Sequence, residues 1–182
     1  MRGHALWFVV AVSLLGCSSP YSGQAEPLVY PKKKEVKSTS TVQACPPEPD
    51  TCKTAFDLKP SYPTAAAKSR QSHSLAQDAD NKMDGYAAAS CVDRKKKAYD
   101  AVTILSDALR TDPYSPLATY TLASVYAQVG KKKCAQAMLM RLNELSKQTD
   151  LQATVTELKT REKTDSSFDG MRKEADGALE GK

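Results

Sequence analysis

The sequence predicts an all-α protein. Apolar residues recur every three or four positions in three consecutive stretches, which is the pattern of the buried face of an amphipathic helix. Helix-breaking signals separate the stretches, and no segment shows the alternation of apolar and polar residues typical of a half-buried strand. The residues that form the three apolar faces are Ala98, Ala101, Val102, Leu105, Ala108 and Leu109; Leu117, Tyr120, Ala123, Tyr126 and Val129; and Ala135, Met138, Leu139, Leu142 and Leu145.

Residues 1–16 are expected to be a signal peptide. Arg2 precedes an apolar run, Ala5 to Leu15, which has the length of a signal-peptide core and is too short to span a bilayer. The run ends in Leu14-Leu15-Gly16-Cys17, which resembles the lipobox of bacterial lipoproteins. The resemblance implies that the chain is cut before Cys17 and that this residue carries the lipid, with acyl chains such as palmitate. The alternative is an ordinary secretory signal followed by a chance cysteine.

The resemblance also implies a location. Ser18, rather than Asp, follows the lipobox cysteine, and by the sorting rule of the family this favours the outer membrane, most simply its periplasmic face. Two or more acyl chains hold a protein firmly at a membrane. The formal net charge of +5 is mild and does not indicate a nucleic-acid partner.

Residues 17–63 are predicted to be a disordered tether. Proline recurs throughout this segment, prevents helix formation and favours an extended, solvated backbone. A basic run, Lys32-Lys33-Lys34, interrupts it, and the few apolar residues follow no period. The tether is therefore expected to hold a folded part away from the membrane.

Four cysteines remain once Cys17 is lipidated. An even number in an exported protein predicts disulfides. Cys45 and Cys52 are neighbours in a proline-rich loop, so local closure favours a bond between them. Cys91 and Cys134 would then be bridged to each other or buried as thiols.

Residues 82–163 are predicted to form the helical domain. Asp112-Pro113 breaks one helix, Ser115-Pro116 has the residue types of a helix start, and Gly130 those of a helix end. A final helix from about residue 150 to 162 carries Leu151, Val155 and Leu158 on one side, which suits a capping helix. Residues 64–81 allow a polar helix, and residues 164–182 are predicted to be disordered.

The chain also repeats itself after 34 residues. The coinciding pairs are Tyr86 with Tyr120, Ala89 with Ala123, Ser90 with Ser124, Lys97 with Lys131, Ala101 with Ala135 and Leu105 with Leu139. A two-helix unit of this length resembles the tetratricopeptide repeat. The matching positions are Leu122, Ala123, Tyr126, Gly130 and Ala135 in the second copy, and Ala89, Ala101, Ala108 and Asp112-Pro113 in the first.

The resemblance is incomplete. Gly85 and Thr119 stand where the family has an early aromatic residue, and Lys147 replaces the closing proline. A generic pair of helical hairpins is the alternative. The predicted architecture is thus about two such hairpins and a capping helix, because each unit must bury its open face against a neighbour.

In that family the first helices line a groove that holds a partner's peptide or helix. Carried over position by position, this implies a protein-binding groove and an envelope protein as partner, with the chain serving as a scaffold or assembly factor. The alternative for each tyrosine is packing against the adjacent repeat. The residues implied for the groove are Tyr86, Ser90, Asp93, Arg94, Tyr120, Ser124 and Gln128.

No catalytic constellation stands out, so an enzyme is not expected. His73 lies in a polar segment with nothing to orient it, and it is the one histidine after the signal peptide. No glycine-rich phosphate loop and no metal-ligand spacing is present, so no cofactor or metal is expected. The alternative function is a structural lipoprotein that attaches electrostatically to the cell wall, with peptidoglycan as its partner.

Overall fold

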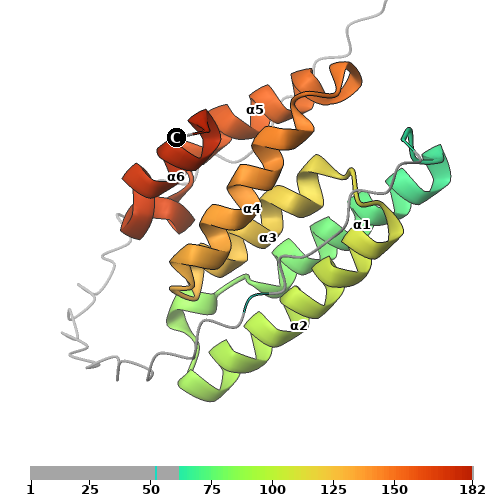
Figure 1. The fold of residues 1–182 in the computed structure, drawn as a ribbon. Coiled ribbons are helices and arrows are strands. Elements are labelled where there is room, and N and C mark those ends of the chain that lie inside the picture. Colours follow the sequence, from blue (N-terminus) through green and yellow to red (C-terminus); the bar gives the residue numbers. More distant parts are fainter. Residues whose placement is uncertain (1–51, 53–61, 182) are drawn as a thin grey trace, which may run out of the picture. The chain divides into compact units, whose positions relative to one another are not determined.

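The computed structural model describes residue 52 and residues 62–181, and within them every regular element is a helix (Figure 1). This confirms the all-α prediction. The predictions for the signal peptide, for Cys17 and Cys45 and for most of the tether lie outside the described residues. The helices are α1 (Ala66–Lys82), α2 (Cys91–Thr111), α3 (Pro116–Gln128), α4 (Lys132–Leu145), α5 (Gln152–Glu162) and α6 (Arg172–Glu180), with short 3-10 helices η1 (Tyr86–Ala88), η2 (Thr149–Leu151) and η3 (Ser166–Met171).

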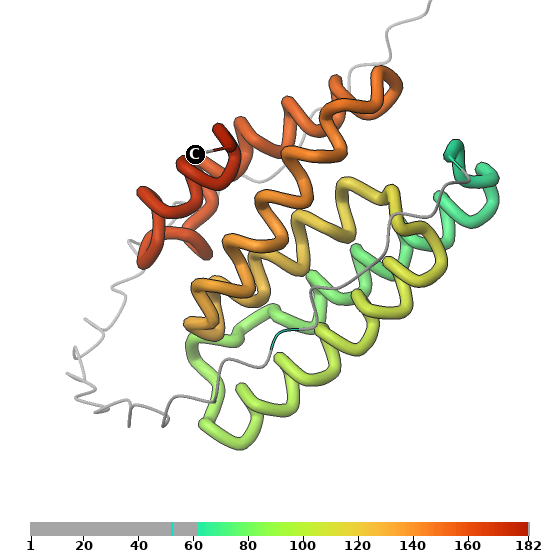
Figure 2. Tube along the Cα trace, in the orientation of Figure 1, coloured from blue at the N-terminus to red at the C-terminus, as the bar shows by residue number. Residues whose placement is uncertain are grey.

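Two antiparallel hairpins form the centre of the domain. Helix α1 packs along α2, and α3 packs along α4, while α1 and α2 both also touch α3 (Figure 2). The remaining elements cover the second hairpin: η3 lies on α3, and α6 lies on α4. Helices α2 and α4 both begin at the same end of the domain, at the lower left of Figures 1 and 2.

The first hairpin is made from different residues than the repeat predicted. Its first helix is α1, and the segment from Met83 to Ala89, predicted to be helical, forms the corner before α2. Gly85 adopts a left-handed conformation there, with φ of 68°, which suits glycine. Helix α2 then runs unbroken through Lys96, the position that the 34-residue register aligns with Gly130, where the second copy's first helix ends.

The start of α2 is fixed by a capping interaction. Ser90 Oγ accepts a hydrogen bond from the backbone N–H of Asp93, and it donates one to Asp93 Oδ2 over 2.7 Å. A cap of this kind satisfies amide groups that have no partner within the helix. Ser90 is therefore a local signal for a helix start at residue 91. The repeat register instead aligned Ser90 with Ser124, inside the first helix of a repeat.

The second hairpin forms as the sequence predicted. Ser115 caps α3, Pro116 is its first residue, and Gly130 has a φ of 78° directly after the helix. The small residues Ala123 and Ala135 are fully buried, as expected where two helices approach closely. Arg141 on α4 donates from Nη2 to the carbonyl oxygen of Pro113 over 2.7 Å, which ties the hairpin to the α2–α3 loop.

The prediction of a disordered end, residues 164–182, is wrong. This segment forms η3 and α6, and it contributes five buried side chains to the core. Their spacing of three and four positions is the helical pattern, although Gly170 and Gly177 interrupt it in the sequence. The buried side chains are Phe168, Met171, Ala175, Ala178 and Leu179.

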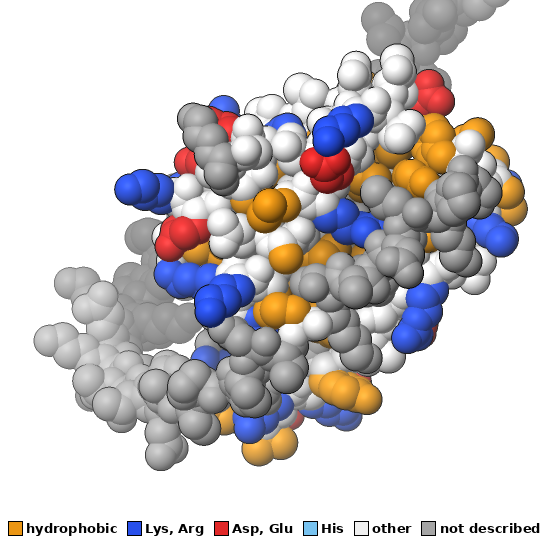
Figure 3. All heavy atoms as spheres, in the orientation of Figure 1, with side chains coloured by type: hydrophobic (Ala, Val, Ile, Leu, Met, Phe, Trp, Pro, Cys, Tyr) orange, Lys and Arg blue, Asp and Glu red, His pale blue; other side chains and the backbone are white. Residues whose placement is uncertain are grey.

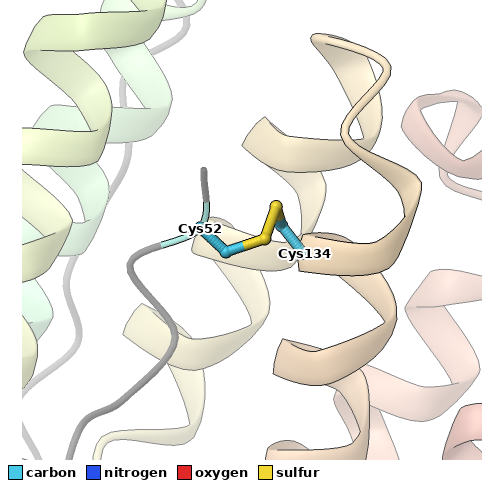
Figure 4. The surroundings of a disulfide bond; sticks show 2 residues. All are labelled: Cys52 and Cys134. Carbon is cyan, nitrogen blue, oxygen red and sulfur yellow. A yellow bond between two sulfur atoms is a disulfide. The ribbon is translucent and has the colours of Figure 1, made fainter. Parts of the chain in front are cut away.

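The predicted Cys45–Cys52 disulfide is also wrong, because Cys52 is bonded to Cys134 near the start of α4 (Figure 4). The bond joins positions 82 residues apart. Cys91 is disulfide-bonded as well, so it does not pair with Cys134 as the sequence allowed. The prediction that the chain contains disulfides is confirmed. These bonds join distant parts of the chain and do not close a local loop.

The end of the predicted tether belongs to the helical domain. Cys52 and Tyr62 pack against its core, and the Tyr62 ring lies 4.8 Å from the Tyr114 ring, centroid to centroid. Burial, and then the charge and hydrogen bond of Asp150, raise the pKa of the Tyr62 hydroxyl. These contacts link the residues before α1 to the α2–α3 loop and to η2.

Candidate functional site

The groove residues predicted from the first repeat lie at the α1–α2 corner, where three of them serve the fold. Ser90 and Asp93 form the cap of α2, and Arg94 Nε donates to the carbonyl oxygen of Ala89 over 2.9 Å. Tyr86 is half-buried against the core. Tyr86 lies in η1, Ser90 is the N-cap of α2, and Asp93 and Arg94 lie in the first turn of α2, so the four residues do not lie on one helix as the predicted groove required.

The groove residues predicted from the second repeat lie together on α3, but the chain covers them itself. Tyr120 is only 2% exposed, and its hydroxyl donates to Asp165 Oδ2 over 2.7 Å. Ser124 Oγ and Gln128 Nε2 each contact Ser167 Oγ over 2.9 Å. Tyr120 is therefore a core residue, but it packs against the C-terminal segment and not against the adjacent repeat, and this part of the predicted groove is filled by the chain's own residues 165–168.

Residues 165–170, which cover this part of α3, are held in place by several contacts. The Tyr120 ring lies 5.9 Å from the ring of the fully buried Phe168, and the guanidinium of Arg161 lies 5.5 Å from the Tyr120 centroid on α3. Burial and the hydrogen bond to Asp165 raise the pKa of Tyr120 well above its usual range, so its hydroxyl stays a donor. Lys132 also donates to the carbonyl oxygen of Gly170.

An ion pair joins buried Glu162, the last residue of α5, to part-exposed Arg172 at the start of α6. Glu162 is fully buried, and its Oε1 accepts from Arg172 Nη1 over 3.0 Å, while its Oε2 has no hydrogen-bond partner. Arg172 also donates to the carbonyl oxygen of Asp165 and to Asp169 Oδ1. Burial raises the pKa of Glu162, and the charge of Arg172 only partly offsets this.

One part of the α3 face remains open. A cavity of about 310 Å³ lies between α1, the start of α3 and α5. Its apolar wall contains Leu117 from α3, Leu151 from η2 and Leu158 from α5. The complete lining is Ser69, His73, Asp112, Tyr114, Ser115, Pro116, Leu117, Leu151, Thr154, Glu157, Leu158 and Arg161.

One wall of this cavity is held rigidly by Asp112. Its carboxylate is buried and accepts from Thr64 Oγ1 over 2.7 Å, from Ser69 Oγ over 2.9 Å and from the backbone N–H of Tyr114 over 3.0 Å. These three donors come from the segment before α1, from α1 and from the α2–α3 loop. A carboxylate satisfied in this way positions structure and does not need a ligand.

The rim of the cavity carries both signs of charge. Glu157 and Arg161 lie one helical turn apart on α5, and His73 faces them from α1. Arg161 also reaches Asp80 on α1, with 4.0 Å between Nη2 and Oδ2. A lining of apolar side chains with a few polar groups is the usual form of a ligand pocket.

A second cavity of about 310 Å³ lies on the other side of Tyr114. Lys68 and Arg110 line it, together with Pro63 and Thr64. Arg110 is already paired with Asp107, over 2.8 Å. Within the described part of the chain, no three His, Cys, Asp or Glu side chains are grouped as a metal site would require, and none of the helices is both long and apolar enough to cross a membrane.

Comparison with family models, with curated proteins and with solved structures gave no match for this chain. The cavity between α1, α3 and α5 was not predicted from the sequence. Its residues come from the α2–α3 loop, which the sequence marked only as a break, and from helices α1 and α5 at the two edges of the predicted repeats.

Proposed function

We propose that this chain is an envelope lipoprotein, anchored through an acylated Cys17, whose helical domain binds a segment of a partner protein and so serves as a scaffold. The lipobox-like ending of the apolar run supports the anchor. The helical hairpins and the resemblance to the tetratricopeptide repeat support a binding module. The outer membrane remains the proposed location, from Ser18 after the lipobox cysteine.

The observation that carries the binding role is the open cavity between α1, the start of α3 and α5. The rest of the α3 face is filled by the chain itself, through the contacts of Tyr120 and Ser124. Leu117 and Leu151 stay half-buried at the cavity, so apolar surface is left uncovered there. A cavity of this size suits one or two apolar side chains of a partner segment.

Site-specific photocrosslinking in intact cells tests the proposal. A photoreactive residue at Thr154, which lines the cavity, is expected to capture a discrete envelope protein. The same residue at Thr156, exposed on α5 but outside the cavity lining, is the matched control. Equal capture at both positions, or at neither, would contradict a binding site at the cavity.

Substitution of the cavity floor provides the second measurement. Leu117→Asp together with Leu151→Asp should weaken partner capture by about tenfold or more, because apolar anchors in a desolvated pocket typically contribute above about 1–2 kcal/mol. Circular dichroism must show that the variant is folded. If the variant keeps its partner and the protein instead cosediments with purified peptidoglycan, the wall-attachment alternative gains support.

A further inference from the structure

Two cavities lie next to each other along α1 and the α2–α3 loop. We call the one between α1, the start of α3 and α5 the first cavity, and the one lined by Lys68 and Arg110 the second cavity. Each has a volume of about 310 Å³, and Tyr114 lines both. Along α1, Lys68 lines the second cavity, and Ser69, the next residue, lines the first. The two cavities are therefore immediate neighbours.

The two cavities differ in chemistry. Leu117, Leu151 and Leu158 form an apolar wall of the first cavity. Among the described residues that line the second cavity, two are basic and none is acidic. In Figure 3, hydrophobic side chains gather at the upper right, where Figure 1 places the start of α1, and basic side chains lie next to them. An apolar site thus adjoins a basic one.

The two basic side chains of the second cavity are available to a ligand. Both are exposed, and among the described residues Lys68 Nζ has no hydrogen bond and no ion pair. Arg110 pairs with Asp107 through Nη1, but both partners are more than half exposed, at 69% and 55%. An ion pair so exposed contributes little free energy, and a guanidinium has further N–H donors. Neither group must give up a strong interaction to bind an anion.

The carboxylates in this region belong to the first cavity. Asp112 accepts hydrogen bonds from Thr64, from Ser69 and from the backbone N–H of Tyr114, so it does not compete for the two basic side chains. Asp112 and Glu157 both line the first cavity, and neither lines the second. An acidic group of a ligand is therefore favoured in the second cavity and disfavoured in the first.

We propose that the second cavity binds an acidic side chain, Asp or Glu, of the same partner segment whose apolar side chain occupies the first cavity. This assignment rests on the proposed binding role of the first cavity. Lysine and arginine form charge-assisted hydrogen bonds with a carboxylate. Lys68 and His73, from the linings of the two cavities, are five positions apart on α1, which is roughly 7–8 Å along the helix axis. About two residues of an extended segment span that length.

Selection from a random dodecapeptide phage library tests the proposal. The target is the chain from residue 17 onward, with Cys17→Ser and its disulfides oxidised. Peptides are assigned to the first cavity when they no longer bind the folded variant Leu117→Asp with Leu151→Asp. These peptides are expected to carry Asp or Glu about two positions from an apolar residue, several-fold more often than the unselected library does.

Two matched charge variants measure the contribution of the second cavity. Lys68→Gln with Arg110→Gln should weaken binding of a selected peptide by about tenfold, the usual effect of losing a hydrogen-bond partner of a charged group. Arg70→Gln with Lys173→Gln removes the same charge at exposed positions that line neither cavity, and it should leave the affinity unchanged. Fluorescence anisotropy of the labelled peptide gives the affinities, and circular dichroism checks that each variant is folded.

A change in the peptide provides the second half of this comparison. The same peptide with its Asp or Glu replaced by Asn or Gln should lose about tenfold in affinity for the unchanged chain. The variant Lys68→Gln with Arg110→Gln should bind the two peptides equally, because the interaction that separates them is gone.

Three results would overturn the proposal. The first is selected peptides of the first cavity without an excess of Asp or Glu. The second is equal weakening by both charge variants, which would indicate general electrostatic attraction. The third is an amide peptide that loses as much affinity for the Lys68 and Arg110 variant as for the unchanged chain. In all three cases peptides would still bind at the first cavity, so the proposed function would stand. If no selected peptide depended on Leu117 and Leu151, the binding role of the first cavity would fail, and this assignment with it.

Discussion

At the scale of single residues, the buried carboxylate of Glu162, paired with part-exposed Arg172, is the clearest case of a polar group whose burial costs free energy. Glu162 is fully buried, and only one of its two carboxylate oxygens has a partner. A carboxylate in such surroundings is poorly solvated, so burial raises the pKa of Glu162 in the folded protein. This has a consequence for how stability depends on pH.

Glu162→Gln is expected to reduce the loss of stability that accompanies rising pH. The raised pKa means that folding binds a proton more tightly, so the contribution of Glu162 is fully present below its ordinary pKa of 4.5 and is lost as pH rises through the folded value. Glutamine does not titrate. Urea unfolding at pH 4 and pH 7 should show a smaller decrease for the variant, and an equal decrease would contradict a buried titrating Glu162.

Ala135→Leu is expected to destabilise the domain by about 1–3 kcal/mol through overpacking. Ala135 is fully buried on α4, as its repeat-matched position predicted. A thermal melt followed by circular dichroism measures the effect. Ala137→Leu, a half-buried position two residues along the same helix, is the comparison, and it should cost clearly less.

At the scale of elements, the C-terminal segment with η3 and α6 covers part of the groove that the sequence predicted. Phe168 is fully buried beside Tyr120, so η3 forms part of the core and does not rest loosely on α3. A segment of the chain itself thus lies on the α3 residues that the sequence predicted for a partner-binding groove. The remaining opening is the cavity next to Leu117, at the other end of the same helix face.

Phe168→Ala should destabilise the domain by about 3–5 kcal/mol, the usual cost of removing a buried phenylalanine side chain. Urea unfolding would measure it, with Ser166→Ala, an exposed position of the same 3-10 helix, as the control. If Phe168→Ala were as stable as the control, the C-terminal segment would not be part of the core, and the α3 face would be open to partners after all.

The disulfides are expected to link the N-terminal part of the chain to both hairpins. Cys52 is bonded to Cys134, and Cys91 is bonded to another cysteine, so Cys45 is its expected partner if Cys17 is lipidated. Peptide mapping without reduction should recover both linked pairs, and a Cys45–Cys52 peptide would contradict this arrangement. On the chain-entropy model, the Cys52–Cys134 link across 82 residues stabilises the fold by about 4–5 kcal/mol.

At the scale of the whole molecule, the sequence predicted those elements whose local signals agreed with one another. Helix α3 has a cap, a proline at its first position and a glycine after its end, and all three act as expected. The prediction of the first hairpin failed because it followed the repeat register and not the local signals, which are the cap at Ser90 and the turn at Gly85. Periodicity alone cannot show which of two neighbouring helices pairs with α2.

Long-range pairings were beyond the sequence for a physical reason. Local closure favours Cys45 with Cys52, but the fold brings Cys52 beside Cys134, and only the packed helices determine that proximity. The candidate cavity has the same origin. Leu117, Leu151 and His73 come from three separate elements, and no spacing in the sequence connects them.

Membrane attachment of the whole chain is expected to depend on Cys17. Cys17→Ser should abolish labelling by a fatty-acid probe and move the protein to the aqueous phase on detergent partition, because no thiol is left to receive the lipid. Ser18→Ala keeps the thiol and should behave like the unchanged chain. A Cys17→Ser variant that still labels with the probe would contradict the assignment.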